Sequence, residues 1–190
     1  MRAPQRDRRD PGRRDGGYPA HVSGGWRAAN GASVRIRSIA AGDSELIREF
    51  VHSLSFETRY LRFMSVVKEL SPQTVDRLTR IDHRYDAALI AIVNEQGADR
   101  VVGVTRYVLD ADSESCEFAI VLADDWRRLG LGRRLMTLLV DTASARGLKR
   151  IRGDVLGINR SMLAFVKALG FSASASNDDP TIRRVELAIA

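Results

Sequence analysis

The chain has 190 residues, of which 44% are hydrophobic, and a formal net charge of +6 at pH 7. This length and composition suit a globular protein with a core of its own. No apolar stretch is long enough to cross a membrane, and the charged N-terminus lacks the apolar segment of a secretory signal, so we expect a cytoplasmic protein without membrane contact. The single cysteine, Cys116, excludes an internal disulfide, and no cluster with metal-ligand spacing accompanies it, so no metal is expected.

The positive charge is concentrated at the N-terminus. Residues 1–33 hold seven arginines and three aspartates, a net +4 that leaves +2 for residues 34–190. Because the first segment is rich in Arg, Asp, Gly and Pro without apolar periodicity, we interpret it as a disordered basic tail, and 34–190 as one folded domain. A nucleic-acid-binding domain would carry a larger basic excess in its folded part, so nucleic acid is not the expected partner.

Apolar periodicity in the first half of the folded region predicts helices followed by a sheet. Alternation indicates strands, 3.6-residue spacing indicates helices, and Ser71-Pro72 is typical of a helix start. In chain order we expect a strand at 34–39, helices at 46–54, 55–63 and 71–81, and strands at 87–93, 101–109 and 116–122. Because the links between the last three strands are short, they should form an antiparallel meander.

The second half alternates helices with strands. A helix should follow Gly132 and end near Gly147, a strand should span 149–156, a helix capped by Asn159 should end near Gly170, and a last strand should span 181–189. Because a helix connects them, the strands at 116–122 and 149–156 should be parallel. The expected fold class is therefore α/β with a mixed sheet, in which an antiparallel meander precedes a parallel β-α-β unit.

The most informative motif is Arg-Arg-Leu-Gly-Leu-Gly at residues 127–132. It joins an apolar strand to an amphipathic helix led by Arg133 and Arg134. Cations are disfavoured at a helix N-terminus, where unpaired N–H groups already carry positive charge. Clustered arginines there make sense if a bound anion, such as a phosphate, lies among them. Asp124 and Asp125 precede the motif and could neutralise part of its charge.

Two common phosphate-binding motifs, the dinucleotide fingerprint and the Walker loop, match this stretch poorly. Gly130-Leu131-Gly132 could begin a dinucleotide fingerprint, with Asp154 about 20 residues further on. However, Leu135 replaces the third glycine, and the motif follows an antiparallel meander instead of opening alternating β and α units. A Walker loop is excluded because no Gly-Lys-Ser/Thr sequence follows.

The pattern Arg127-x-x-Gly130-x-Gly132 instead resembles the acetyl-CoA signature of the GNAT N-acetyltransferase superfamily. In addition, Asn159 and the helix ending in Leu-Gly-Phe at 169–171 resemble that superfamily's second CoA-binding segment. The order of elements over 34–189 also agrees. The chain is thus identified as a member of this superfamily, which implies a GNAT-like fold and acetyl-CoA as the acyl donor.

A narrower resemblance is to the catalytic domain of Pat-type bacterial protein lysine acetyltransferases. It rests on Glu57–Phe63, Lys68–Ser71, Ile81-Asp82 and Glu117–Ala119. The chain departs from that group at His83-Arg84-Tyr85, and it has no room for the large regulatory regions that such proteins often carry. Both departures put the protein substrate and its regulation in doubt.

The GNAT resemblance assigns the cofactor site residue by residue. Backbone N–H groups from Leu129 to Arg133 would hold the pyrophosphate, with nearby charge from the arginines, and a free strand edge would pair with the pantetheine amides. The resulting set of acetyl-CoA-binding residues is Ile120, Val121, Leu122, Arg127, Arg128, Leu129, Gly130, Leu131, Gly132, Arg133 and Asn159. Ile120 and Leu122 also suit the core, and Asn159 also suits a plain helix cap.

Glu117 is the candidate general base. Transfer to an amine requires the neutral amine, and a lysine has a reference pKa near 10.4. Glu117 interrupts an apolar strand near the expected thioester, where burial would make its carboxylate more basic. The alternative is an exposed carboxylate paired with Arg106 across the hairpin. Val166 stands where many superfamily members have a tyrosine that protonates the thiolate.

Several alternatives remain open from the sequence. Ser161, Tyr85 or water could protonate the thiolate, and the loop of His83 could border the acceptor site. Cys116 could carry an acetyl group, although a buried inert thiol is favoured. The leading hypothesis is acetylation of a protein lysine by direct attack. A small amine or antibiotic acceptor, or a non-catalytic CoA-binding module, are the alternatives. The sequence gives neither the acceptor nor the oligomeric state.

Overall fold

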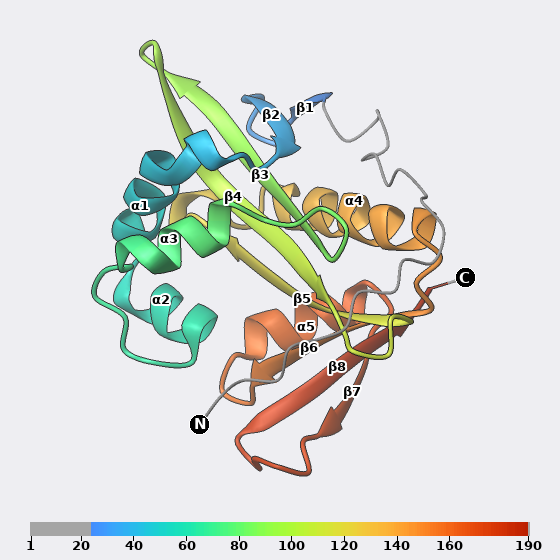
Figure 1. Ribbon diagram of the computed structural model, residues 1–190. Coiled ribbons are helices and arrows are strands. Elements are labelled where there is room, and N and C mark those ends of the chain that lie inside the picture. Colours follow the sequence, from blue (N-terminus) through green and yellow to red (C-terminus); the bar gives the residue numbers. More distant parts are fainter. Residues whose placement is uncertain (1–23, 190) are drawn as a thin grey trace, which may run out of the picture.

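The computed structural model describes residues 24–189 (Figure 1). Within them an eight-stranded mixed sheet has the order β1-β2-β3-β4-β5-β6-β8-β7. The strands are β1 (Gly24–Arg27), β2 (Ser33–Ser38), β3 (Asp86–Glu95), β4 (Ala98–Leu109), β5 (Ser115–Leu122), β6 (Arg150–Leu156), β7 (Ser172–Ala175) and β8 (Ile182–Ala188). The helices are α1 (Ser44–Ser53), α2 (Phe56–Phe63), α3 (Pro72–Thr79), α4 (Leu131–Ala145) and α5 (Arg160–Ala168), with 3₁₀ turns at Ala41–Asp43 and Asp124–Trp126.

The pairing confirms the predicted mixed α/β sheet. β3, β4 and β5 form the antiparallel meander, and β5 pairs with β6 in parallel. The hairpin between β3 and β4 turns over two residues, Gln96 with φ 55° and Gly97 with φ 91°. Two successive left-handed residues give the turn whose twist matches the flanking strands.

The predicted helix starts are confirmed. The Ser71 side chain accepts a hydrogen bond from the Thr74 N–H, and Pro72 occupies the first turn of α3. The Asn159 side chain likewise accepts from the Met162 N–H at the start of α5. These side chains satisfy N–H groups that have no partner within the helix.

The folded region begins earlier than predicted. Gly24–Arg27 form β1, which pairs antiparallel with β2, so the expectation of a disordered tail is wrong for residues 24–33. The rest of the predicted tail, residues 1–23, lies outside the described residues. Ser172–Ala175 form β7, a second strand that the sequence did not predict, against β8.

Helices cover both faces of the sheet. Figure 1 shows α1, α2 and α3 on one side and α4 on the other. Side chains of α4 and α5 form one core cluster with alternate residues of β5, such as Cys116 and Phe118. None of the helices in the described part of the chain is both long and apolar enough to span a membrane.

Candidate functional site

The two central strands separate halfway along their length. β5 and β6 are paired only from Ser115 to Glu117 on one strand and from Arg150 to Arg152 on the other. Beyond this point β5 remains paired with β4, and β6 with β8. The Phe118 ring lies where the two strands separate, so close to Gly153 that a Cβ there would be 2.8 Å from it. The facing backbone edges therefore lack a neighbouring strand, and an extended ligand could pair with them.

A cavity of about 620 Å³ lies at this opening. Its wall comes from α2, β5, the β5–α4 loop, β6 and α5, so segments distant in sequence meet there. The predicted site residues that line it are Glu117, Ile120, Val121, Leu122, Arg127, Arg128, Gly130, Gly132, Arg133 and Asn159. Its volume falls within the range usual for small-molecule and cofactor sites.

Two predicted site residues do not line the cavity with their side chains. Leu131 is fully buried in a second core cluster, formed with residues of α1, β2 and β3, and Leu129 packs against that cluster. Their predicted role concerned backbone N–H groups only. The Leu129 carbonyl accepts a hydrogen bond from the Ala29 N–H at 3.2 Å, which ties the loop to the segment after β1.

The loop before α4 has a conformation suited to anions. Arg128 has φ 61° and Gly130 φ 86°, both in the left-handed region, and Gly130 is the N-cap of α4. Such a backbone turns successive N–H groups towards one concave side, where a helix dipole adds positive potential. Gly132 follows within the first turn and is in contact with the cavity.

The arginines of this loop are only partly neutralised. Arg127 pairs with Asp124 at 3.1 Å and donates to Thr58 Oγ1 at 2.5 Å. Arg128 and Arg133 line the cavity and are exposed, and no carboxylate of the described residues lies within 4.0 Å of either. Asp125 does not contribute as expected, because Arg100 holds it through two hydrogen bonds of 3.0 Å.

Asp124 connects the loop to α2. It accepts hydrogen bonds from Ser55 N at 2.8 Å and from Thr58 Oγ1 at 2.5 Å, at the start of that helix. Burial opposes charge on Asp124, but the hydrogen bonds from Thr58 and Ser55 and the charge of Arg127 outweigh it and lower the pKa of its carboxyl group. α2 is thereby fixed against the loop before α4.

Glu117 lies in the cavity but is not buried. Its side chain is 53% exposed, and its Oε2 lies 3.9 Å from Arg152 Nη1. The predicted burial is wrong because Glu117 lies on the sheet face opposite Cys116, at the cavity. Arg106, considered as its partner, lies 3.5 Å from Asp86.

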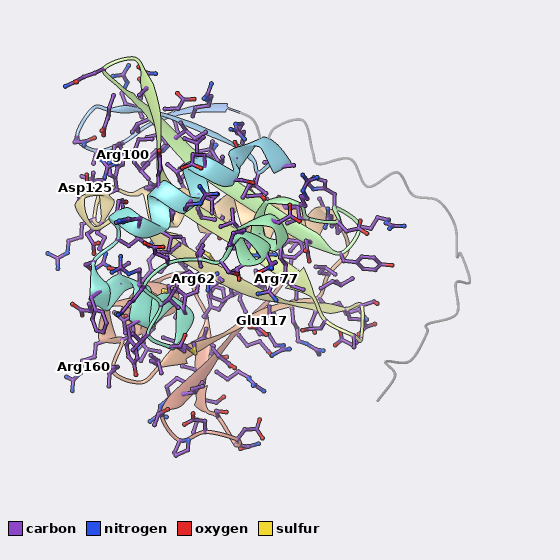
Figure 2. The ribbon with its side chains drawn as sticks, turned by 60° about the vertical axis from the view of Figure 1, so that its left-hand side comes forward. Arg62, Arg77, Arg100, Glu117, Asp125 and Arg160 are labelled. Carbon is purple, nitrogen blue, oxygen red and sulfur yellow. The ribbon has the colours of Figure 1, made fainter. Side chains whose placement is uncertain are left out.

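The sequence reasoning missed the contribution of α2. Thr58, Leu61 and Arg62 line the cavity with Met64, just beyond the helix end. The spacing i, i+3, i+4 places the first three on one helix face, a signal that was available but looked like an ordinary amphipathic helix. Figure 2 shows Arg62 and Glu117 in the same part of the molecule, with Arg100 and Asp125 further along the sheet.

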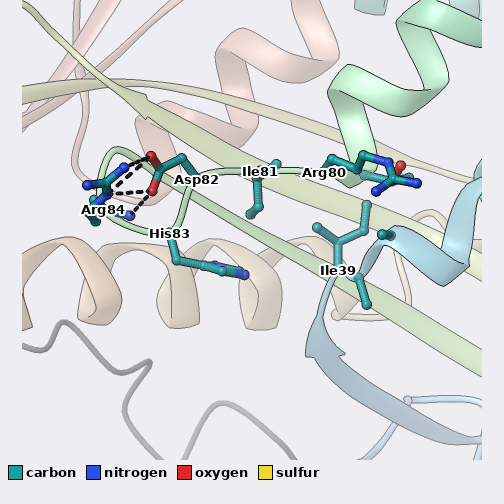
Figure 3. A pocket seen from close by; sticks show the side chains of 9 residues that line it. Ile39, Arg80, Ile81, Asp82, His83 and Arg84 are labelled. Carbon is teal, nitrogen blue, oxygen red and sulfur yellow. Dashed lines mark hydrogen bonds and ion pairs between the residues drawn. The ribbon is translucent and has the colours of Figure 1, made fainter.

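Of the residues considered as proton donors or as neighbours of the acceptor, only some line this cavity. Ser161 lines it and donates a hydrogen bond to Asn159 Oδ1, whereas Tyr85 does not line it. His83 lines a second, shallower hollow between α3 and β3, where Asp82 and Arg84 pair with each other (Figure 3). Val166 is buried in the core.

Cys116 is buried in the core cluster shared by β5 and α4. Burial, and then the charge of Asp110, raise the pKa of its thiol to about 12. A thiol this difficult to ionise is a poor nucleophile, as the inert alternative predicted. Within residues 24–189 no group of three or more His, Cys, Asp or Glu side chains is placed to hold a metal ion.

The chain is similar to known acetyltransferases in both sequence and fold. A family model, Acetyltransferase (GNAT) family, matches residues 51–171. An acetyltransferase of Pseudomonas aeruginosa is 38% identical over 152 residues, which are 80% of this chain and 82% of that protein. The crystal structure of the GNAT domain of S. lividans PAT superposes with a TM-score of 0.82 at 25% identity, covering 90% of this chain and 99% of that one.

A further relative is the ribosomal protein bS18-alanine N-acetyltransferase of Escherichia coli K12. It is 32% identical over 92 residues, which are 48% of this chain and 56% of that protein. The family match, the sequence identity over most of the chain and the shared fold agree with one another. The chain therefore belongs to the GNAT acetyltransferase family, whose members transfer an acetyl group from acetyl-CoA to an amine.

Proposed function

We propose that the cavity between β5 and β6 holds acetyl-CoA and that Glu117 is the general base for acetylation of a protein lysine. The observation that carries this proposal is the cavity itself. It joins an anion-binding loop at one end to an accessible carboxylate at the other, along an unpaired strand edge. Coenzyme A carries phosphates, an amide-containing arm and a thiol in the same order.

The loop before α4 supplies the phosphate end. In this proposal the pyrophosphate is bound by N–H groups of Leu129 to Arg133, which the left-handed residues Arg128 and Gly130 orient. Arg128 and Arg133 add charge from side chains that have no carboxylate partner among the described residues. Asn159, at the start of α5, also lines the cavity and would bond the arm of CoA.

The free edge of β5 supplies the middle of the site. Residues 118–122 have no strand partner on the β6 side, so their backbone groups can bond the pantetheine amides. This pairing would place the thioester near Glu117, where the two strands meet. Nine of the eleven residues in the acetyl-CoA-binding set predicted from the sequence line this cavity, which supports the proposed arrangement.

Glu117 would accept the proton that the acceptor amine loses. In direct transfer the amine nitrogen forms a bond to the acetyl carbonyl carbon, the carbon–sulfur bond breaks, and the sulfur leaves as a thiolate. The thiolate then needs a proton. Of the two side chains considered as its proton donor, Ser161 lines the cavity and Tyr85 does not, and water is the other source. The inert Cys116 argues against a covalent acetyl-enzyme.

The likeness to the S. lividans PAT domain agrees with the Pat-type resemblance of the sequence, and that resemblance implies a lysine side chain as the acceptor. The E. coli relative favours a second candidate, the α-amine of a protein N-terminus. The two differ in chemistry, because an α-amine has a reference pKa near 7.7–8.0 and a lysine near 10.4. An α-amine acceptor therefore depends less on a base at neutral pH.

The test combines acetyl-CoA binding with product analysis. Calorimetry should show acetyl-CoA binding, and incubation with lysine peptides should release free thiol. Mass spectrometry of peptides that carry both amines then locates the acetyl group. Acetylation at lysine supports the proposal, and acetylation at the N-terminus alone favours the second candidate. Binding without thiol release from any amine would contradict both.

A further inference from the structure

Arg62 is a cation at the Glu117 end of the cavity. It lies in the last turn of α2, on the helix face that carries Thr58 and Leu61, and lines the cavity together with Glu117. Its guanidinium interacts electrostatically with Glu117 and Arg106, and Figure 2 shows Arg62 and Glu117 in the same part of the molecule.

Arg62 differs from the other arginines of this neighbourhood in its partners. Arg152 pairs with Asp110 at 2.7 Å and Arg106 with Asp86 at 3.5 Å. Arg62 makes no hydrogen bond or ion pair with any residue between 24 and 189, and its contact is with the Phe63 ring, 5.1 Å from the ring centroid.

The Arg62 guanidinium is also partly removed from water. Burial, and secondarily the positive charge of Arg106, lower its pKa to about 10, while Glu117 acts in the opposite direction. It remains charged at neutral pH. Because a desolvated charge is unfavourable unless it is paired, the cavity at this point is suited to an anion.

The CoA phosphates do not account for Arg62. The anion-binding loop follows Leu122, five residues along β5 from Glu117, which corresponds to about 16 Å of extended strand. Phosphates held by that loop would lie at the opposite end of the cavity. Glu117 is the carboxylate of the protein that acts on Arg62, so a further anion at this end of the cavity would enter with the other substrate.

We propose that Arg62 binds a carboxylate carried by the acceptor, so that the enzyme acetylates amines that have a carboxylate group on the same molecule. This inference rests on the proposed function. A guanidinium can hold a carboxylate through two parallel hydrogen bonds, which would orient the amine towards Glu117 and the thioester. The carboxylate can come from an acidic residue beside an acceptor lysine or from a free amino acid.

Matched acceptors test the proposal. One pair of lysine peptides differs only by Asp or Asn on both sides of the lysine, and a second pair compares free lysine with its decarboxylated amine, cadaverine. If the carboxylate comes from a neighbouring acidic residue, kcat/KM should be higher for the Asp peptide than for the Asn peptide. If it comes from a free amino acid, kcat/KM should be higher for lysine than for cadaverine. In either case charge-assisted hydrogen bonds predict a ratio of about tenfold to hundredfold. Equal values within both pairs would overturn the proposal even though thiol is released.

Substitution of Arg62 assigns the preference to this side chain. Arg62→Gln should abolish the difference within the favoured pair through a higher KM for the carboxylate-bearing member, and Arg62→Lys should restore part of it. The KM for acetyl-CoA and the melting temperature should stay near the wild-type values. Arg48→Gln, on the exposed surface of α1, is the matched control and should retain the full preference.

A binding measurement separates this inference from the proposed function. If no acceptor releases thiol, calorimetry of both pairs with the CoA-loaded protein still reports the preference. Tighter binding of a carboxylate-bearing member to wild type than to Arg62→Gln supports the inference without catalysis. Equal binding to wild type and Arg62→Gln contradicts it.

Discussion

Glu117 and Arg62 show how strongly local surroundings decide what a side chain can do. Glu117 has Arg152 as its neighbour, but at 3.9 Å the contact is longer than a hydrogen bond. Its carboxylate therefore stays available to accept a proton from an amine. Arg62 lies in the same cavity and has no carboxylate partner in residues 24–189. A base and an unpaired cation together match an acceptor that has both an amine and an anion.

Glu117→Gln should lower kcat about 100-fold or more at neutral pH, because glutamine cannot accept a proton from the amine. Acetyl-CoA affinity should be nearly unchanged, since the phosphate loop is at the other end of the cavity. Steady-state kinetics with a true acceptor and calorimetry with acetyl-CoA provide the two readouts. Turnover within twofold of wild type would remove Glu117 from the mechanism.

Cys116 should resist thiol reagents in the native protein. With its pKa raised to about 12 by burial, only about one thiol in ten thousand is ionised at pH 8, so native labelling should be slow. The unfolded chain has an ordinary thiol pKa near 8.5, so about a quarter of its thiol is ionised at pH 8 and its labelling should be far faster than that of the native protein. Quench-labelling with and without denaturant measures both rates. Rapid native labelling, or an acetyl group found on Cys116 during turnover, would contradict the inert thiol.

At the scale of elements, the site depends on what the sheet leaves unpaired. The β5–β6 opening begins where Phe118 meets Gly153, and the anion-binding loop begins where β5 ends. Asp124 then fixes α2 against that loop through Ser55 and Thr58. One helix, one strand edge and one loop are thereby held in a fixed order along the cavity.

Gly130→Ala should weaken acetyl-CoA binding. Gly130 has φ 86°, a conformation that costs a residue with a Cβ about 1–2 kcal/mol, and a Cβ there would lie 3.4 Å from the Trp26 ring. The loop should relax and misalign its N–H groups, which raises the Kd measured by calorimetry. Gly42→Ala is the control, because no atom lies within 4 Å of its added Cβ and its φ is not positive. Equal Kd values for the two variants would show that loop conformation does not govern binding.

The elements that were predictable are those whose side chains alone determine them. Alternation and helical spacing gave the meander, the helices and the parallel pairing of β5 with β6. β1 and β7 were not predicted because their sequences, Gly-Gly-Trp-Arg and Ser-Ala-Ser-Ala, have little apolar pattern. They are strands because they pair with β2 and β8. The contribution of α2 to the cavity was missed for a different reason: the spacing of its cavity-lining residues is that of any amphipathic helix, and only the packing of α2 beside β5 shows what that face lines.

At the scale of the whole molecule, the N-terminal segment contacts the loop before α4, which is the proposed phosphate end of the site. The Trp26 ring lies against Gly130, and the Ala29 N–H donates to the Leu129 carbonyl at 3.2 Å. Both contacts come from a segment that the sequence assigned to a tail. Residues 24–33 are therefore part of the described fold, and Trp26 and Ala29 contact the loop before α4.

Two truncations test this boundary. A chain beginning at Gly24 should bind acetyl-CoA as tightly as the full chain. A chain beginning at Val34 lacks β1 and the contacts to Leu129 and Gly130, so we expect a lower melting temperature and a higher Kd. Thermal unfolding and calorimetry report the two effects. If both truncated chains behave alike, β1 does not support the loop.

The central claim is that acetyl-CoA lies in the opening between β5 and β6 with its thioester at Glu117. A crystal structure of the protein with acetyl-CoA tests it most directly. We expect the pyrophosphate on the N–H groups of Leu129 to Arg133, the pantetheine amides paired with the free edge of β5, and the thioester carbonyl near the Glu117 carboxylate. A pyrophosphate bound away from that loop, or a thioester at the opposite end of the cavity from Glu117, would contradict the account.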